Sequence, residues 1–161
     1  MTCKKLNVDP LKCNGCGLCE AACARVHNTD NLEKSRIRVL PGGEDGRFYL
    51  PTTCQHCENP PCMAVCPEEA IFRDPDTDGV MIDKKRCIGC RMCVSACPFG
   101  AMNFDADLGT AFKCDLCNGD PECARVCETG ALDYVEDLFL NYQRLKESSG
   151  KYYNVLRHMA A

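Results

Sequence analysis

The fold of this chain is decided by one stretch of sequence, Cys87-Ile88-Gly89-Cys90-Arg91-Met92-Cys93-Val94-Ser95-Ala96-Cys97-Pro98. Its first three cysteines are separated by two residues each, and a fourth follows after three more and precedes a proline. Three other stretches repeat this cysteine arrangement, beginning at Cys13, Cys54 and Cys114. The second and fourth stretches have a longer middle spacer, and of the three only the second also ends in a proline, Pro67. The sequence is therefore a fourfold internal repeat of a cysteine motif.

The four groups use sixteen of the seventeen cysteines. Disulfide scaffolds belong to exported proteins, and residues 1–10 lack the apolar segment of an export signal. Structural zinc sites use two separated cysteine pairs, which these compact groups do not match. Thiolates at this spacing are typical of iron–sulfur proteins, so we expect four [4Fe–4S] clusters. The candidate ligands are Cys13, Cys16, Cys19, Cys23, Cys54, Cys57, Cys62, Cys66, Cys87, Cys90, Cys93, Cys97, Cys114, Cys117, Cys123 and Cys127.

The composition predicts a small apolar core that depends on its metal centres. The 161 residues include no Trp, 6 Phe and 5 Tyr, against 12 Gly and 9 Pro. The formal charge is −4, and four oxidised clusters with their thiolates would bring it to about −12. Such a negative protein is a poor partner for nucleic acid. No apolar stretch approaches the roughly 18 residues of a membrane span, and we expect a cytoplasmic protein.

Short strands and turns separate the cysteine groups. Residues 36–40 and 47–50 are expected to pair as a hairpin, and residues 101–104 with 110–113 as another. Single strands are expected at 80–83 and 131–134, and the three-residue spacer before each fourth cysteine suits one helical turn. Apolar residues recur at helical spacing after Tyr134, which predicts a helical tail over residues 135–161. The tail is expected either to cover a face of the domain or to dock on another subunit.

Three stretches carry a resemblance to a known family, namely residues 54–62, 87–93 and 113–117. From about residue 7 to 134 the chain resembles the four-cluster ferredoxin-type subunits that serve several classes of oxidoreductase. These classes are the molybdenum and tungsten enzymes of the dimethyl sulfoxide reductase type, formate dehydrogenases, hydrogenases and carbon monoxide dehydrogenases. The chain is also similar in its compactness to the small subunit of tungsten aldehyde oxidoreductases.

The resemblance implies how the cysteines pair. The first group would pair with the fourth, and the second with the third. The four implied ligand sets are Cys13, Cys16, Cys19 and Cys127; Cys23, Cys114, Cys117 and Cys123; Cys54, Cys57, Cys62 and Cys97; and Cys66, Cys87, Cys90 and Cys93. Pairing of the groups in sequential order remains open from spacing alone. The implied α+β fold is a loop-rich, nested dicluster ferredoxin-like domain over residues 1–134, with an inner ferredoxin at about 51–104.

The function implied by the resemblance is a relay of single electrons by a subunit that is not itself catalytic. The expected partner is the catalytic subunit of a tungsten or molybdenum aldehyde or formate oxidoreductase, of a hydrogenase or of a carbon monoxide dehydrogenase. A flavin- or NAD-binding subunit and a second copy of the chain are further candidates. The alternatives are a free polyferredoxin and an iron–sulfur sensor or maturation protein. Glu128 departs from the family, which commonly has a proline at this position.

A few residues outside the ligand set invite a functional interpretation. Cys3 lies apart from every group and is expected to be a spare thiol. His56 lies within the second group, where four thiolates leave it a solvated or hydrogen-bonding role rather than a ligand's. His27 and His158 are expected to have no metal-ligand partners nearby.

Overall fold

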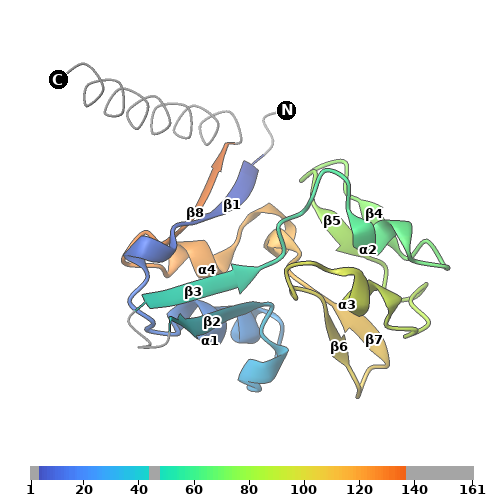
Figure 1. The fold of residues 1–161 in the computed structure, drawn as a ribbon, viewed down its shortest axis with the longest axis horizontal. Helices are drawn as coiled ribbons and strands as arrows, with labels where there is room; N and C mark the ends of the chain where they lie inside the picture. The colour runs from blue at the N-terminus through green and yellow to red at the C-terminus, as the bar shows by residue number, and fades with distance from the viewer. Residues whose placement is uncertain (1–3, 44–47, 137–161) are drawn as a thin grey trace.

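The computed structural model describes residues 4–43 and 48–136. Cys3, His158 and the predicted helical tail lie outside the described residues. The described chain forms two lobes, which lie side by side in Figure 1.

The outer lobe is built from both ends of the described chain. Its elements are β1 (Lys4–Val8), α1 (Leu18–Val26), β2 (Ile37–Gly42), β3 (Phe48–Thr53), α4 (Glu122–Arg125) and β8 (Leu132–Glu136), with 3-10 turns at Pro10–Lys12 and Leu32–Lys34. The inner lobe is built from the middle of the chain. Its elements are α2 (Pro61–Ala64), β4 (Ile71–Arg73), β5 (Val80–Ile82), α3 (Met92–Ala96), β6 (Asn103–Asp105) and β7 (Thr110–Phe112). A 3-10 turn at Leu116–Gly119 leads back to the outer lobe.

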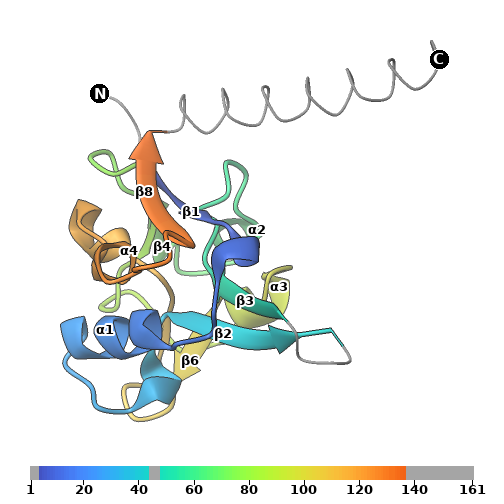
Figure 2. The same ribbon diagram turned by 90° about the vertical axis from the view of Figure 1, so that its left-hand side faces the viewer.

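Every sheet in the described chain is an antiparallel pair, in the order β1–β8, β2–β3, β4–β5 and β6–β7. The pair β1–β8 joins residues from opposite ends of the described chain, with Val8 opposite Leu132, as Figure 2 shows. The expected hairpins are confirmed as β2–β3 and β6–β7. Sequence reasoning missed β1, whose partner β8 lies at the other end of the described chain. It also missed β4, a strand of three residues that pairs with the neighbouring β5.

Helices occupy the spacers in which a helical turn was expected. The helices α2, α3 and α4 are four or five residues long, and α1 continues to nine. Two helix pairs form, α1 with α4 in the outer lobe and α2 with α3 in the inner lobe. The loop-rich α+β fold is therefore as expected.

Each lobe has its own small core, and cysteines form part of both. The buried residues of the inner core are Cys62, Ile71, Val80, Cys93, Met102 and Ala111. Those of the outer core are Cys19, Cys23, Ile37, Cys123 and Leu132. Because so few aliphatic side chains contribute, whatever binds the cysteines becomes a large part of each core.

Candidate metal centres

The four cysteine groups share one backbone feature. In each group the residue directly before the second cysteine has a left-handed conformation, with φ of +76° at Gly15, +45° at His56, +73° at Gly89 and +55° at Leu116. Glycine adopts this conformation freely, whereas other residues lose about 1–2 kcal/mol. The recurrence of this turn, even where it is costly, indicates that all four loops are shaped for the same kind of ligand.

Three cavities are each lined by four cysteines. In every case three cysteines come from one group and the fourth is the trailing cysteine of another group. The three sets are Cys54, Cys57, Cys62 and Cys97; Cys66, Cys87, Cys90 and Cys93; and Cys23, Cys114, Cys117 and Cys123. The fourth expected set is Cys13, Cys16, Cys19 and Cys127. In this set burial raises the pKa of Cys19 to about 12, and Glu20, Cys16 and Cys127 contribute in the same direction. Cys127 therefore lies near the first group although it belongs to the fourth.

The separation of the sulfur atoms distinguishes between a single metal ion and a cluster. The sixteen described cysteines are all free thiols. Tetrahedral zinc with Zn–S bonds of about 2.3 Å would hold its sulfurs about 3.8 Å apart. Within the described residues, no three cysteine sulfurs lie within 4.8 Å of one another. The sets are therefore too open for one zinc ion and fit a larger inorganic group, such as an iron–sulfur cluster.

Burial makes several of these thiols hard to ionise without a metal. It raises the pKa of Cys114 to about 11 and shifts the pKa of Cys123 further in the same direction. Since thiolates are the ligands of iron, metal binding would have to drive the loss of these protons.

Backbone amides support three of the four trailing cysteines. Arg36 N–H donates to Cys23 Sγ, Ala70 N–H to Cys66 Sγ and Leu132 N–H to Cys127 Sγ, each at 3.3 Å. Hydrogen bonds to a thiolate stabilise its charge and influence the potential of a bound cluster.

Sulfur neighbours also connect one cysteine set to the next. Ionised Cys93 would be repelled by Cys62, ionised Cys114 by Cys54 and ionised Cys123 by Cys19. These three pairs each join two different sets, so the four sets follow one another in a row. Cys90 in the set at one end of the row and Cys16 in the set at the other are exposed.

A polar network forms one wall of the cavity that Cys23 and Cys117 line. His27 Nδ1–H donates to the Cys23 carbonyl oxygen at 2.7 Å, and Nε2 lies 3.3 Å from both carboxylate oxygens of Asp115. Arg36 forms an ion pair with the same carboxylate. Hydrogen bonds to Asp115 and Cys23 raise the pKa of His27 to about 9. Although burial opposes it, the pKa of Asp115 is held well below its usual range by His27 and Arg36.

This network corrects one expectation from the sequence. His27 was expected to have no metal-ligand partners nearby, yet its ring nitrogen, an Asp115 oxygen and the Cys117 sulfur lie within 4.8 Å of one another. The prediction was wrong because Asp115 is 88 residues away in the sequence. The only available signal was the position of Asp115 inside the Cys114–Cys117 motif.

His56 is a buried hydrogen-bonding residue, and only 7% of its surface is exposed. Its Nδ1 accepts a hydrogen bond from Val80 N–H at 2.9 Å. Burial, together with the positive charge of Lys113, lowers the pKa of His56 to about 3. The ring is therefore neutral, and the hydrogen-bonding interpretation is confirmed while the solvated one is not.

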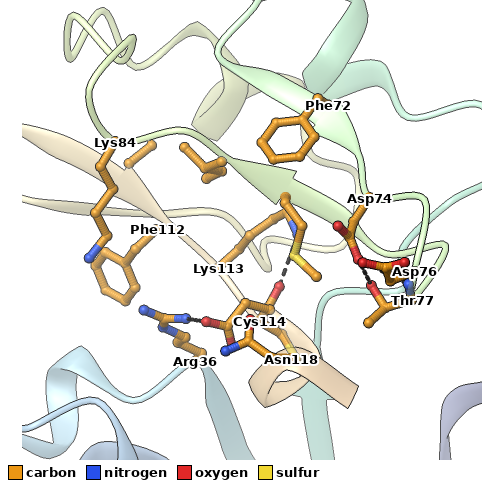
Figure 3. A pocket seen from close by; sticks show the side chains of 14 residues that line it. Arg36, Phe72, Asp74, Asp76, Thr77, Lys84, Phe112, Lys113, Cys114 and Asn118 are labelled. Carbon is orange, nitrogen blue, oxygen red and sulfur yellow. Dashed lines mark hydrogen bonds and ion pairs between the residues drawn. The ribbon is translucent and has the colours of Figure 1, made fainter.

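A further cavity of about 350 Å³ lies beside β5 and β7. Its lining combines positive side chains, including Lys84, with acidic ones such as Asp74 and Asp76 (Figure 3). Lys113 lines both this cavity and the one formed by Cys54, Cys57, Cys62 and Cys97.

Comparison with known proteins agrees with this geometry. Residues 46–137 match a family model described as a 4Fe-4S dicluster domain, and residues 10–26 match a 4Fe-4S binding domain. The chain belongs to the 4Fe-4S dicluster family. Within this family it is 35% identical to the polyferredoxin-like subunit of aliphatic sulfonate oxidoreductase from Pyrococcus furiosus, over 89% of this chain and 83% of the relative. It is 39% identical to the electron transport protein HydN of Escherichia coli K12, over 80% of this chain and 85% of HydN.

A solved structure shows the same dicluster fold. One chain of the active-site complex BamBC of benzoyl coenzyme A reductase, with bound 1,5-dienoyl-CoA, is 26% identical with a TM-score of 0.50. The match covers 84% of this chain and 77% of that chain. Two other curated relatives are much longer, and the chain spans 29% and 21% of their lengths.

The family and the names of its members confirm the predicted class of function. The chain is a ferredoxin-type electron-transfer protein that binds 4Fe-4S clusters, as expected. Among its relatives, PhsB is named as the electron transfer subunit of a thiosulfate reductase and HydN as an electron transport protein. No helix in the described part of the chain is long and apolar enough to cross a membrane.

Proposed function

We propose that the chain holds four [4Fe–4S] clusters and relays single electrons along them. The observation that carries this proposal is the row of four cysteine sets, three of which line cavities of their own. The proposed ligand sets are Cys66, Cys87, Cys90 and Cys93; Cys54, Cys57, Cys62 and Cys97; Cys23, Cys114, Cys117 and Cys123; and Cys13, Cys16, Cys19 and Cys127.

The lining of the cavities supports the nested pairing of groups over the sequential one. In a sequential pairing Cys97 would share a cavity with the fourth group, whereas it lines the cavity of Cys54 and Cys57. Likewise, Cys23 lines a cavity with Cys114 and not with the second group. On this assignment the inner ferredoxin is inserted into the outer one, with domain limits at about residues 51–104 and 1–134.

When bound, each cluster supplies a centre that accepts and releases one electron. The positions of the cysteine ligands determine the path that electrons would take from one cluster to the next. The sulfur pairs Cys93–Cys62, Cys54–Cys114 and Cys123–Cys19 connect successive sets. Exposed Cys90 and Cys16 place one set at each surface end of the row, where redox partners would dock. No cysteine of the two sets between them is exposed.

The proposed partner is the catalytic subunit of an oxidoreductase. Relatives are named as subunits of an aliphatic sulfonate oxidoreductase and of a thiosulfate reductase, which favours such a complex. A molybdenum, tungsten or nickel enzyme of the classes named above is the specific form of this proposal, in the cytoplasm. A separate electron carrier is the second candidate, because HydN is named simply as an electron transport protein.

Anaerobic purification with metal and sulfide analysis tests the proposal. We expect about sixteen iron and sixteen sulfide ions per chain, and an equilibrium titration in which all four centres accept an electron. Bound zinc without sulfide, or about eight irons per chain, would contradict four clusters. Centres that cannot be reduced reversibly would indicate a structural role instead of a relay. A large metal-containing subunit that copurifies in equal amount would distinguish a dedicated subunit from a free carrier.

A further inference from the structure

Lys113 is a buried lysine at the junction of the two lobes. Only 4% of its surface is exposed, and it lies between β7 and Cys114. Its ammonium group donates hydrogen bonds to the carbonyl oxygens of Val80 and Cys114, the latter at 2.9 Å. A lysine ammonium has three N–H donors, so these two bonds leave one donor to be satisfied.

No carboxylate neutralises this buried charge in the part of the chain that the structure describes. The nearest acidic residue in the sequence, Asp115, forms its ion pairs with Arg36 and His27 instead. Burying an unpaired ammonium costs several kcal/mol, and two carbonyl groups offset only part of that cost. The site therefore requires an additional negative group.

The proposed clusters provide that negative charge. Lys113 lines the cavity that Cys62 helps to form, and its ammonium group donates a hydrogen bond to the carbonyl oxygen of Cys114. These two cysteines belong to the two middle sets of the row. An oxidised four-thiolate cluster carries a charge of about −2, so an ammonium in this position has a partner as soon as a cluster is bound.

We propose that Lys113 is the internal counter-ion of the cluster held by Cys54, Cys57, Cys62 and Cys97 and donates its third N–H to that cluster. This assignment rests on the proposed function. A cation beside a cluster stabilises the reduced form, in which the negative charge is larger, and so raises its reduction potential. Lys113 would thus make this middle cluster easier to reduce than it would be in its absence.

The Lys113→Met variant of the full chain, with its clusters, tests the assignment. In a titration with dithionite as reductant, followed by electron paramagnetic resonance, we expect the potential of one cluster to fall more than the others. The cluster potentials of Lys113→Arg, which keeps the positive charge, should stay closer to those of the wild type. The matched control is Lys84→Met, since Lys84 is an exposed lysine on the adjoining cavity and its loss changes the net charge equally. A Lys113→Met protein with full iron content and potentials equal to those of Lys84→Met would overturn the assignment.

A second measurement uses the wild-type chain and does not depend on how the variant folds. With lysine that carries ¹⁵N at Nζ alone, pulsed electron paramagnetic resonance of the reduced protein should detect a ¹⁵N coupling that is absent from Lys113→Arg. Absence of this coupling in the wild type would refute the assignment, even if Lys113→Met loses iron. An incomplete set of clusters in the wild type would contradict the proposed function, whereas four clusters without the lysine coupling would contradict only the role of Lys113.

Discussion

The four cysteine loops differ in how they achieve the same turn. The end loops, residues 13–19 and 87–93, have Gly15 and Gly89 at the left-handed position and expose Cys16 and Cys90. The central loops, residues 54–62 and 114–123, have His56 and Leu116 there, and both of these side chains are buried. One backbone path is therefore built in two ways. The end loops use glycine, where a Cβ would lie 2.6 Å from the Tyr49 ring or 2.5 Å from the Gly109 carbonyl oxygen, and the central loops use buried side chains.

The difference shows what offsets the strain in the central loops. A non-glycine residue in this conformation loses about 1–2 kcal/mol, whereas full burial of a leucine side chain contributes roughly 1.5–3 kcal/mol. Burial of Leu116 is thus enough to hold its turn, and His56 gains a hydrogen bond from Val80 as well. The end loops lack this burial, and glycine makes it unnecessary.

The largest effect should come from removing a ligand from each kind of loop. Cys90→Ser removes an exposed ligand at one end of the row, and we expect it to lose about four of sixteen irons. Cys114→Ser removes a buried ligand where the lobes meet, and we expect it to lose about eight or more because the fold around the neighbouring set loosens. Iron and sulfide analysis of the purified chains measures both losses. Equal iron loss in the two variants would show that central and end loops contribute alike.

Leu116→Ala should lower the free energy of unfolding by about 3 kcal/mol, the usual cost of a leucine-sized cavity. Leu116 is 2% exposed, and the matched control Leu108→Ala removes the same atoms from a side chain that is 62% exposed. The control should change stability by less than about 0.5 kcal/mol. The measurement is the denaturant concentration at which half of the chains lose their visible iron–sulfur absorption. Similar midpoints for both variants would mean that burial does not hold the central loop.

Gly89→Ala should cost about 2 kcal/mol or more, because two penalties combine. A Cβ at Gly89 would lie 2.5 Å from the Gly109 carbonyl oxygen, and φ there is +73°. Gly100→Ala is the control for the backbone strain alone, because φ at Gly100 is +60° and nothing lies within 4 Å of an added Cβ. The same absorption assay in denaturant separates the two variants. If Gly100→Ala proved equally damaging, the close approach of the backbone would be unimportant.

The smallest effect is expected at Arg91, which has φ of +61° two residues after Gly89 in an end loop. Its guanidinium lies 3.9 Å from the centre of the Phe104 ring. Arg91→Gly relieves the backbone strain and removes a cation–π contact of about 0.5–1 kcal/mol, so the net change should be below about 1 kcal/mol. Arg91→Ala removes the contact without relieving the strain and should be the less stable of the two. Greater stability of the alanine variant in the same assay would contradict this balance.

The cysteine spacing predicted the family, and strand-like residues on either side of a turn predicted the hairpins β2–β3 and β6–β7, because these patterns are local in the sequence. At Gly15 and Gly89 the glycine between two cysteines is a local signal for this turn, although it was not among the sequence predictions. His56 and Leu116 gave no such signal, since their left-handed conformation depends on burial that only the folded chain provides.

The polar network was missed for a related reason. His27 and Arg36 lie 88 and 79 residues from Asp115, so no local pattern connects them. The ligand pairing and the domain limits remain predictions that the cavities support. The choice of metal enzyme among the expected partners was beyond the sequence, because specificity for a partner depends on a surface that the cysteine motifs do not encode.

The pairing of β1 with β8 has a consequence for the order in which the protein is made. On the proposed assignment, both ligand sets of the inner lobe are complete once residue 97 has left the ribosome. The set that contains Cys13 is complete only when Cys127 has been made. The inner lobe can therefore receive its metal while synthesis continues, and the first thiols remain unligated until the last strand returns to close the outer lobe. A ribosome that stalls between these two points would present a half-loaded chain with reactive cysteines, so the rate of translation through residues 98–127 becomes a factor in how safely this protein is assembled.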